Sequence, residues 1–265
     1  MLELTNRKSS AIHPTALVDP AARLGEGVTV GPYSIIEAGA SIGSGTKIGA
    51  HVAVSGFTRI GGDCRIFHGA VLGSDPQDLK FNGEETHLEI GDRTIIREYA
   101  TLNRGTHQRR KTVVGSDCFI MSYAHVAHDC CVGDHVILAN SVNMAGHVTI
   151  EDWAVVGGVV PIHQFVHVGR HAMIGGGFRV AQDVCPYTLL GGYPLAVVGL
   201  NIVGLKRRGF TAAQLGPLRS AFRLLFQSGL NTSQALDRIA TDIEPTAEVG
   251  HLVAFIRASA RGITK

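Results

Sequence analysis

The chain has 265 residues and a formal net charge of only +2, so we do not expect a bulk electrostatic grip on nucleic acid. It has no apolar run of about 18 residues, and its start, MLELTNRKSS, lacks the apolar stretch of a signal peptide. We therefore expect a cytoplasmic protein with reduced cysteines and no transmembrane segment. Its 33 glycines and 6% aromatic residues indicate many tight turns.

An apolar residue recurs at every sixth position over most of the first 180 residues. A period of six fits neither an α-helix nor a single strand, but it is typical of a parallel β-helix. Three hexads make one coil, and the apolar residue of each hexad points inward. The register runs through Ile12, Val18, Leu24, Val30, Ile36, Ile42, Ile48, Val54, Ile60, Ile66 and Leu72, then Ile90, Ile96 and Leu102, then Val114, Ile120, Val126, Val132, Leu138, Met144, Ile150, Val156, Ile162, Val168, Ile174 and Val180.

The fifth position of each hexad is mostly small, which suits the tight corner of a coil. Cys64, Cys118 and Cys130 occupy this position, so we interpret them as corner packing and not as metal ligands or nucleophiles. The two interruptions of the register, at 73–89 and 103–113, are expected to be loops that project from the coils.

The repeat ends after Tyr187, and helical signals follow. Thr211 and Gln214 have the spacing of a capping box, and LRSAFRLLFQSG (218–229) has helical periodicity with a glycine stop. Two more helices are expected within 233–243 and 248–262. The sequence thus predicts an all-β parallel β-helix domain at 1–190 and a C-terminal α-helical domain at 191–265.

Histidines gather on one edge of the predicted prism. Residues one coil apart stack at about 4.8 Å, the spacing of neighbouring strands. One coil beyond His128 lies Gly146, beside His147, and a further coil on lies Gln164, beside His163. This clustering favours acid–base catalysis, with one histidine as the base and its neighbouring aspartate orienting it. The alternative is that these are polar residues of a solvated face.

A zinc site is a second alternative. His163, His167 and His171 have an H-x3-H spacing, which on an α-helix would place them on one face. In a six-residue repeat, a spacing of four sends them to different faces. We therefore expect no metal and no other cofactor.

Several longer strings carry a family resemblance. HVAHDCCVGDHVILAN, NMAGHVTI, GGVVPIHQFVHVG, AQDVCPY, NIVGLKRRGF and PQDLKFNGE resemble the UDP-N-acetylglucosamine acyltransferases of lipid A biosynthesis, over nearly the whole chain. The resemblance implies a left-handed β-helix and a homotrimer with its cleft between subunits. It also implies transfer of a 3-hydroxyacyl chain from acyl carrier protein to the 3-hydroxyl of UDP-N-acetylglucosamine, without an acyl-enzyme.

The resemblance also implies residue roles. His128 would be the general base, Asp129 would orient it, and the Gly146 N–H would hold the oxyanion. Gly176 would end a hydrocarbon ruler. It follows His128 by 48 residues, which is 2.7 coils or about 13 Å along the axis, so acyl chains somewhat longer than about ten carbons should fit. The implied substrate-binding residues are Asp78, Lys80, His125, His147, His163 and Gln164, with Asn201 and Arg207 for the nucleotide.

One position departs from the family pattern. The string NIVGLKRRGF has Val203 where the family usually has Glu, so a carboxylate contact to the nucleotide would be missing. The structural interpretation of Lys206, Arg207 and Arg208 is a solvated turn before a helix; functionally, arginines suit a diphosphate or an acidic carrier protein.

Other functions stay open at this point. The related N-acyltransferase has an extra N-terminal uridine-binding domain, for which hexads that begin at Ile12 leave no room. A β-helical carbonic anhydrase and a non-catalytic scaffold are the alternatives from other classes. Whether the acceptor atom is a hydroxyl or an amine of a 3-amino sugar is not decided by the sequence.

Overall fold

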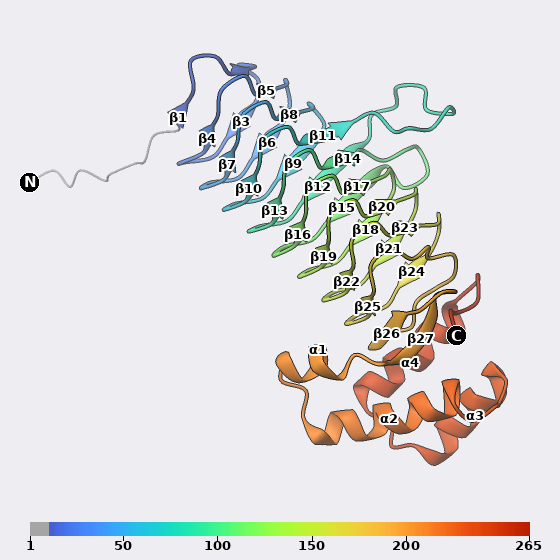
Figure 1. Ribbon diagram of the computed structural model, residues 1–265. Helices are drawn as coiled ribbons and strands as arrows, with labels where there is room; N and C mark the ends of the chain where they lie inside the picture. Colours follow the sequence, from blue (N-terminus) through green and yellow to red (C-terminus); the bar gives the residue numbers. More distant parts are fainter. Residues whose placement is uncertain (1–10) are drawn as a thin grey trace, which may run out of the picture.

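The computed structural model describes residues 11–265, so the MLELTNRKSS segment lies outside the described residues. The first part is a left-handed parallel β-helix whose coils stack into a prism with three flat sheets (Figure 1). Sheet A contains β1 (Ala11–Ile12), β4 (Thr29–Val30), β7 (Lys47–Ile48), β10 (Arg65–Ile66), β13 (Ile95–Ile96), β16 (Phe119–Ile120), β19 (Ile137–Leu138), β22 (Val155–Val156), β25 (Met173–Ile174), β26 (Thr188–Gly191) and β27 (Ala196–Leu200).

The other two faces are built in the same way. Sheet B contains β2 (Leu17–Val18), β5 (Ile35–Ile36), β8 (Ala53–Val54), β11 (Val71–Ser74), β14 (Thr101–Asn103), β17 (His125–Val126), β20 (Asn143–Met144) and β23 (Pro161–Ile162). Sheet C contains β3 (Arg23–Leu24), β6 (Ser41–Ile42), β9 (Thr58–Ile60), β12 (His87–Ile90), β15 (Lys111–Val114), β18 (Cys131–Val132), β21 (Thr149–Ile150) and β24 (His167–Val168).

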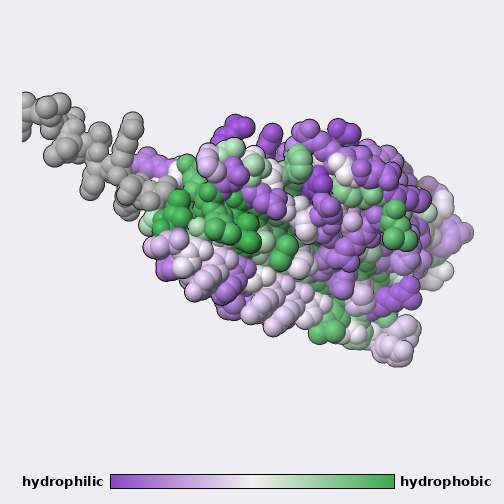
Figure 2. Space-filling view, turned by 90° about the horizontal axis from the view of Figure 1, so that it is seen from above, coloured by the Kyte–Doolittle hydropathy of each residue, from purple (hydrophilic) through white to green (hydrophobic). Residues whose placement is uncertain are grey.

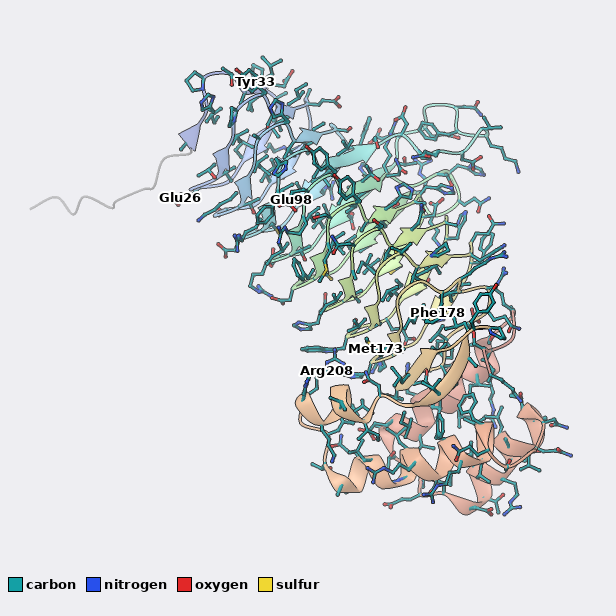
Figure 3. All side chains as sticks on the ribbon, in the orientation of Figure 1. Glu26, Tyr33, Glu98, Met173, Phe178 and Arg208 are labelled. Atoms are coloured by element: carbon teal, nitrogen blue, oxygen red, sulfur yellow. The ribbon has the colours of Figure 1, made fainter. Side chains whose placement is uncertain are left out.

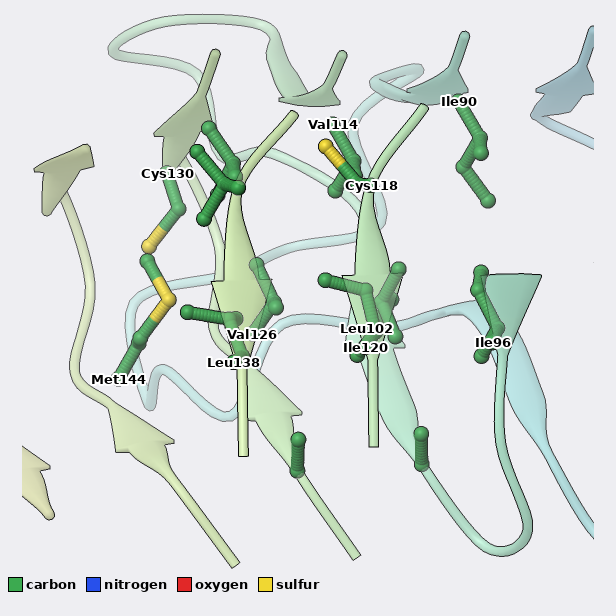
Figure 4. Packing of buried hydrophobic residues seen from close by; sticks show 14 of the residues in the cluster. Ile90, Ile96, Leu102, Val114, Cys118, Ile120, Val126, Cys130, Leu138 and Met144 are labelled. Atoms are coloured by element: carbon green, nitrogen blue, oxygen red, sulfur yellow. The ribbon is translucent and has the colours of Figure 1, made fainter. Parts of the chain in front are cut away.

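The strand register confirms the six-residue repeat. Ile12 pairs with Val30, and Ile48 pairs with Ile66, one coil of three hexads further on. The apolar register residues fill the interior, where they are almost completely buried from Val30 onward (Figure 4). Ile12, in the first coil, is 45% exposed.

The corner cysteines are buried as predicted. Cys64, Cys118 and Cys130 are each at most 1% exposed, and their thiols contact backbone carbonyls of the next coil. Figure 4 shows Cys118 and Cys130 among the aliphatic side chains of the core. Burial raises the pKa of Cys118 to about 11 and that of Cys130 to about 12, so both stay protonated at neutral pH.

Both loops leave the prism at the same edge. The first loop (75–86) connects β11 to β12, and the second loop (104–110) connects β14 to β15, so each replaces a turn from sheet B to sheet C. The turns after β17, β20 and β23 lie on this edge too, which we call the B–C edge. The two loops and the histidine-bearing turns are therefore neighbours, because each of them connects a strand of sheet B to a strand of sheet C.

The C-terminal part begins with a β-hairpin that the sequence analysis missed. β26 continues sheet A in parallel with β25, and β27 returns antiparallel to β26. The predicted domain boundary between residues 190 and 191 falls inside β26. Four helices follow and pack against the end of the β-helix (Figure 1): α1 (Ile202–Arg207), α2 (Ala212–Phe226), α3 (Thr232–Asp242) and α4 (Ala247–Ala258).

The capping box at Thr211 and Gln214 is present and starts α2. The sequence analysis did not identify the second box, Asn231 with Gln234, which starts α3. It also interpreted 206–208 as a turn, whereas Lys206 and Arg207 form the last turn of α1. Among residues 11–265, none of the helices combines the length and apolar character needed to cross a membrane.

Candidate active site

His128 and Asp129 form a hydrogen-bonded pair in the turn after β17. His128 Nδ1 lies 2.9 Å from Asp129 Oδ2. A carboxylate can only accept, so Nδ1 carries the proton and Nε2 carries the lone pair. Nε2 has no hydrogen-bond partner among the described residues. The pair therefore presents a basic nitrogen on the B–C edge.

The second loop holds the carboxylate of Asp129 in place. The backbone N–H of Thr106 donates to Oδ1 at 2.9 Å, and its hydroxyl donates to Oδ2 at 2.6 Å. Arg109 donates from its guanidinium to the Asp129 carbonyl at 2.9 Å. Burial by itself would raise the pKa of Asp129, but the hydrogen bonds from His128 and Thr106 outweigh it and lower the pKa to about 2. Asp129 is thus a fixed, ionised group.

Gly146 lies against the ring of His128, one coil further on. A Cβ atom built on Gly146 would be 2.5 Å from His128 Cε1 and 2.7 Å from Nε2, so only glycine permits this approach. The Gly146 N–H donates to no group within residues 11–265. A free backbone donor therefore lies beside the basic nitrogen.

His147 and His125 flank the pair. The His147 ring stacks on Phe165, with centroids 4.6 Å apart, and its Nε2 lies 3.7 Å from Asp129 Oδ2. His125 Nδ1 shares a hydrogen bond of 2.7 Å with the Thr101 hydroxyl. Burial lowers the pKa of both histidines, and for His125 the nearby His128 lowers it further. Both rings are neutral at pH 7.

His163 and Gln164 occupy the next turn of the same edge. His163 Nδ1 lies 3.1 Å from the Gln164 carbonyl oxygen and 3.2 Å from Nη2 of Arg261, a residue of the C-terminal tail. The Gln164 side chain is exposed. The structure therefore brings His128, His147 and His163 together on the B–C edge, as the coil period predicted, with His125 beside them in β17 of sheet B.

Asp78 and Lys80 lie in the first loop, beside this edge. The Asp78 carboxylate accepts from the Lys80 N–H at 3.0 Å, and its charge acts on His147. Arg104, only 6% exposed, braces the loop: it donates to Asp75 at 2.8 Å and lies over the ring of Phe81. The loop is thus held by a buried cation.

Asn201 and Arg207 lie elsewhere, on the side of sheet A. They line a groove of about 580 Å³ whose floor is apolar, formed by Ile137, Val155, Met173 and Leu189. In Figure 3, Met173 and Arg208 mark this side of the prism, where α1 meets the strands. Val203, at the departure from the family pattern, also lines the groove.

The Asn201 side chain has a structural role that the sequence analysis did not anticipate. Its oxygen accepts from the Gly204 N–H at 3.1 Å, and its amide donates to the His171 carbonyl at 2.9 Å. Asn201 therefore caps α1 and ties it to the β-helix. A direct contact with nucleotide remains a prediction for this residue.

Gly176 is not on the B–C edge. It lies in the turn between β25 of sheet A and Val180, which forms a bridge with Ile162 of sheet B, and it packs against Gly158 of the preceding coil. The 48 residues from His128 are not a whole number of coils, so the chain has turned to another edge. Within one chain, the proposed ruler and the basic histidine are separated by the width of sheet B.

The positions of the histidines bear on whether this chain could bind a metal ion. His163, in the B–C turn, His167, in β24, and His171, in the turn from sheet C to sheet A, lie on different sides, as the six-residue period predicted. A different set, His128, Asp129 and His147, has ligand atoms within 4.8 Å of one another and could hold an ion. Asp129 is already occupied by Thr106 and His128, so this set does not need one to satisfy its hydrogen bonds.

Comparison with known proteins decides the family. A family profile described as UDP N-acetylglucosamine O-acyltransferase, domain 2, matches residues 183–264, and bacterial transferase hexapeptide repeats match 21–56 and 111–146. The acyl-(acyl-carrier-protein)–UDP-N-acetylglucosamine O-acyltransferase of Chlorobaculum parvum is 54% identical over 96% of this chain and 96% of its own length. This chain belongs to that family. The enzyme of the same name from Verminephrobacter eiseniae is 48% identical over 97% of the chain and its whole length.

Solved structures of this acyltransferase family agree. A UDP-N-acetylglucosamine acyltransferase from Bacteroides fragilis has a TM-score of 0.93 at 42% identity, covering 96% of this chain and 99% of that one. The enzyme from Francisella novicida has a TM-score of 0.91 at 35% identity, covering 96% and 93%. The protein is therefore an acyltransferase with the left-handed β-helix and C-terminal helices that its repeats and motifs predicted.

The sequence analysis did not identify the residues that hold Asp129, His163 and the first loop in place. Thr106, Arg109 and Arg104 belong to the loops, and Arg261 belongs to the tail. One signal was available: both register breaks fall between a sheet-B hexad and a sheet-C hexad, the same phase as His128. Counting that phase would have placed both loops at the histidine edge.

Proposed function

We propose that this protein transfers a 3-hydroxyacyl chain from acyl carrier protein to the 3-hydroxyl of UDP-N-acetylglucosamine, in the cytoplasm, as a step of lipid A biosynthesis. The names of its relatives support the donor and acceptor classes. The observation that carries the chemistry is the His128–Asp129 pair, whose Nε2 lies beside the Gly146 N–H, neither of which has a hydrogen-bond partner within residues 11–265.

This geometry supports a reaction in which His128 is the general base. The sugar hydroxyl gives its proton to His128 Nε2 as its oxygen attacks the thioester carbonyl carbon. The carbonyl oxygen becomes an oxyanion, and the Gly146 N–H donates to it. When the carbon–sulfur bond breaks, the protonated His128 returns the proton to the leaving thiolate. Asp129 stays ionised throughout and stabilises the imidazolium in between.

A cysteine nucleophile is not needed in this scheme. Cys130 is the cysteine beside Asp129, and it is buried with a raised pKa of about 12. Cys131 is exposed but sits in β18 on sheet C, beyond the turn that carries His128. A direct transfer without an acyl-enzyme is therefore the simpler mechanism. Replacing Cys131 with Ser is expected to leave turnover unchanged.

Substrate contacts are proposed for both sides of the prism. Asp78, Lys80, His125, His147, His163 and Gln164 would bind the sugar and phosphates at the B–C edge. Arg207 would bind the diphosphate in the groove on sheet A, whose apolar floor suits an acyl chain. Since these two regions lie on different sides of one chain, a complete site needs a neighbouring copy.

A homotrimer would supply that copy. An isolated prism exposes apolar side chains that a neighbour could cover, including Leu17 (66% exposed), Ile35 (46%) and Tyr123 (61%). Figure 2 shows the apolar patch over the N-terminal coils. In a three-fold ring, the B–C edge of one copy can face the sheet-A groove of the next.

The base is tested by replacing His128 with Ala. We expect turnover of 3-hydroxyacyl carrier protein and UDP-N-acetylglucosamine to fall by about 10²–10⁴-fold, the usual contribution of a general base, with the fold retained by circular dichroism. His13→Ala, on the exposed first coil, is the matched control. An H128A protein with half of the normal activity would remove His128 from this role. If wild-type protein acylates only a 3-amino sugar nucleotide, the 3-hydroxyl of UDP-N-acetylglucosamine is not the acceptor.

The shared site is tested by mixing two variants. H128A and R207A chains are unfolded together and refolded, then assayed at low UDP-sugar concentration. If His128 and Arg207 of one site come from adjacent copies, about a quarter of the sites in randomly mixed rings are wild-type. Mixed protein no more active than the average of the two parents would contradict a shared site.

A further inference from the structure

The C-terminal tail reaches the B–C edge and is fixed there by Asp183. The Asp183 N–H donates to the Gly262 carbonyl at 3.1 Å, and the Thr264 N–H donates to the Asp183 carbonyl at 2.8 Å. Asp183 is only 4% exposed, and its carboxylate accepts from the Ser259 hydroxyl at 2.6 Å and from the His167 N–H at 2.8 Å. These bonds hold both sides of Arg261 against the β-helix.

Fixed in this way, Arg261 points its guanidinium at His163. Its Nη2 lies 3.2 Å from His163 Nδ1 and 3.3 Å from the Ala181 carbonyl oxygen. Its Nε is buried and has no partner among the described residues. The His163 ring nitrogen is thus one of two acceptors that Nη2 of Arg261 has among the described residues.

His163 Nδ1 therefore lies between a donor and an acceptor. The guanidinium can only donate, and the Gln164 carbonyl oxygen, at 3.1 Å from Nδ1, can only accept. Nδ1 cannot serve both, because it carries either a proton or a lone pair. The bond from Arg261 is charge-assisted and is the stronger of the two.

We propose that Arg261 sets the tautomer of His163, keeping the lone pair on Nδ1 and the proton on Nε2, so that His163 is a hydrogen-bond donor to an oxygen of the bound substrate. The donor role toward substrate rests on the function proposed above; the tautomer does not. His128 and His163, on the same edge, thus have opposite hydrogen-bonding roles toward the substrate. His128, with a carboxylate behind it, presents a lone pair, and His163, with a guanidinium behind it, presents an N–H. Arg261 is a positioning residue in this scheme.

The tautomer is tested on 15N-histidine-labelled, full-length protein without substrate. The nitrogen with the lone pair resonates far downfield of the protonated one, and the His163 signals are assigned by their absence from H163Q. In wild-type protein we expect the lone pair on Nδ1. In R261M, which has no donor, we expect the proton to move to Nδ1, toward the Gln164 carbonyl. R261K, which retains a cationic donor, should keep the wild-type pattern.

The consequence for turnover is tested with a double-mutant cycle. R261M is expected to lower kcat/KM by about fivefold to tenfold, the net strength of one hydrogen bond, and R261K to recover most of it. In an H163A background, R261M should have no further effect. R257M is the matched control, since Arg257 is exposed in the last turn of α4 and its side chain makes no hydrogen bond or ion pair with the described residues.

The outcomes separate the inference from the proposed function. A wild-type His163 with its proton on Nδ1, or an unchanged pattern in R261M, overturns the inference whatever the activity. An R261M effect of equal size in the wild-type and H163A backgrounds also overturns it, because Arg261 then acts on something other than His163. If the tautomer responds as expected but no variant or wild-type protein transfers acyl groups, the proposed function fails and the tautomer assignment stands.

Discussion

Gly146 and His128 are in contact across one coil: a Cβ atom on Gly146 would come within 2.5 Å of His128 Cε1. The backbone conformation of Gly146 is not left-handed, so alanine would be tolerated there except for this contact. The ring of His128 would have to move, and its bond to Asp129 fixes where it now lies. The glycine therefore sets the distance between the basic nitrogen and the backbone donor.

Replacing Gly146 with Ala should lower kcat by about 10²-fold, the lower end of what a general base contributes, because the added methyl group displaces the ring of His128. The N–H remains in this variant, so the loss reports the displaced ring. Gly250→Ala is the control, because Gly250 lies in α4 with open space around an added Cβ. Initial rates are compared with circular dichroism of both variants. A G146A enzyme as active as G250A would show that the close contact does not matter for turnover.

Asp129 should make stability depend on pH in a defined window. Its pKa is lowered to about 2 in the folded protein, so between pH 2 and its ordinary value near 4 the unfolded chain binds more protons. Its stabilising contribution, about 2 kcal/mol, is therefore full above about pH 4 and is lost as the pH falls toward 2. Asp129→Asn removes this term. The difference in unfolding free energy between wild-type and D129N protein should shrink by about this amount as the pH is lowered from 5 to 2, and the difference in Tm should shrink with it.

The control for that measurement is a second carboxylate far from the site. Asp242 pairs with Arg238 on the exposed surface of α3, where an ion pair contributes little. D242N should give a Tm difference that stays small at every pH. A difference for D129N that is constant between pH 5 and pH 2 would mean that Asp129 is not ionised with a lowered pKa in the folded protein.

Arg207→Ala should raise KM for the UDP-sugar more than it lowers kcat. The groove that Arg207 lines is far from the reacting hydroxyl in the proposed arrangement, so the lost contact weakens ground state and transition state alike. Lys206→Ala is the matched control: the neighbouring cation is exposed and does not line the groove. Steady-state kinetics over UDP-sugar concentration distinguish the two. Equal KM values for R207A and wild-type protein would place the nucleotide elsewhere.

The fold could be predicted because the hexad is a strictly local signal. Each register residue, such as Val126 or Met144, needs only to be apolar to fill its layer of the interior, and the period then dictates three sheets. The same phase predicts which turns share an edge, and so it placed His128 beside Gly146. Coil counting therefore gave both the architecture and the centre of the candidate site.

The supporting residues could not be predicted in this way, because they come from segments without a period. Thr106 reaches Asp129 from a loop whose conformation no repeat specifies. Arg261 reaches His163 across almost a hundred residues, through the docking of the tail on Asp183. Gly176 does lie within the repeat, but its position was predicted incompletely. The prediction used its distance from His128 along the β-helix axis. It did not use the rotation about that axis, about two-thirds of a coil, which moves Gly176 to another edge.

Gly176 is predicted to limit the length of the acyl chain. Met173, three residues before Gly176 in the same chain, lines the apolar groove of sheet A. In the proposed trimer this groove faces the His128 of another copy, so an acyl chain that runs from that His128 along the groove would end near Gly176 of the copy that supplies the groove. Replacing Gly176 with Met should shift the preference toward chains of about ten carbons, because the added side chain would overlap the terminal methylenes. A Cβ at Gly176 would also be 3.0 Å from the Gly158 carbonyl oxygen, so Tm and oligomeric state are measured alongside. Gly176→Ala serves as the control, since it makes the same backbone contact without the long side chain. If G176M and G176A have equal stability and the same chain-length profile in a competition assay with mixed acyl carrier protein thioesters, Gly176 does not limit chain length.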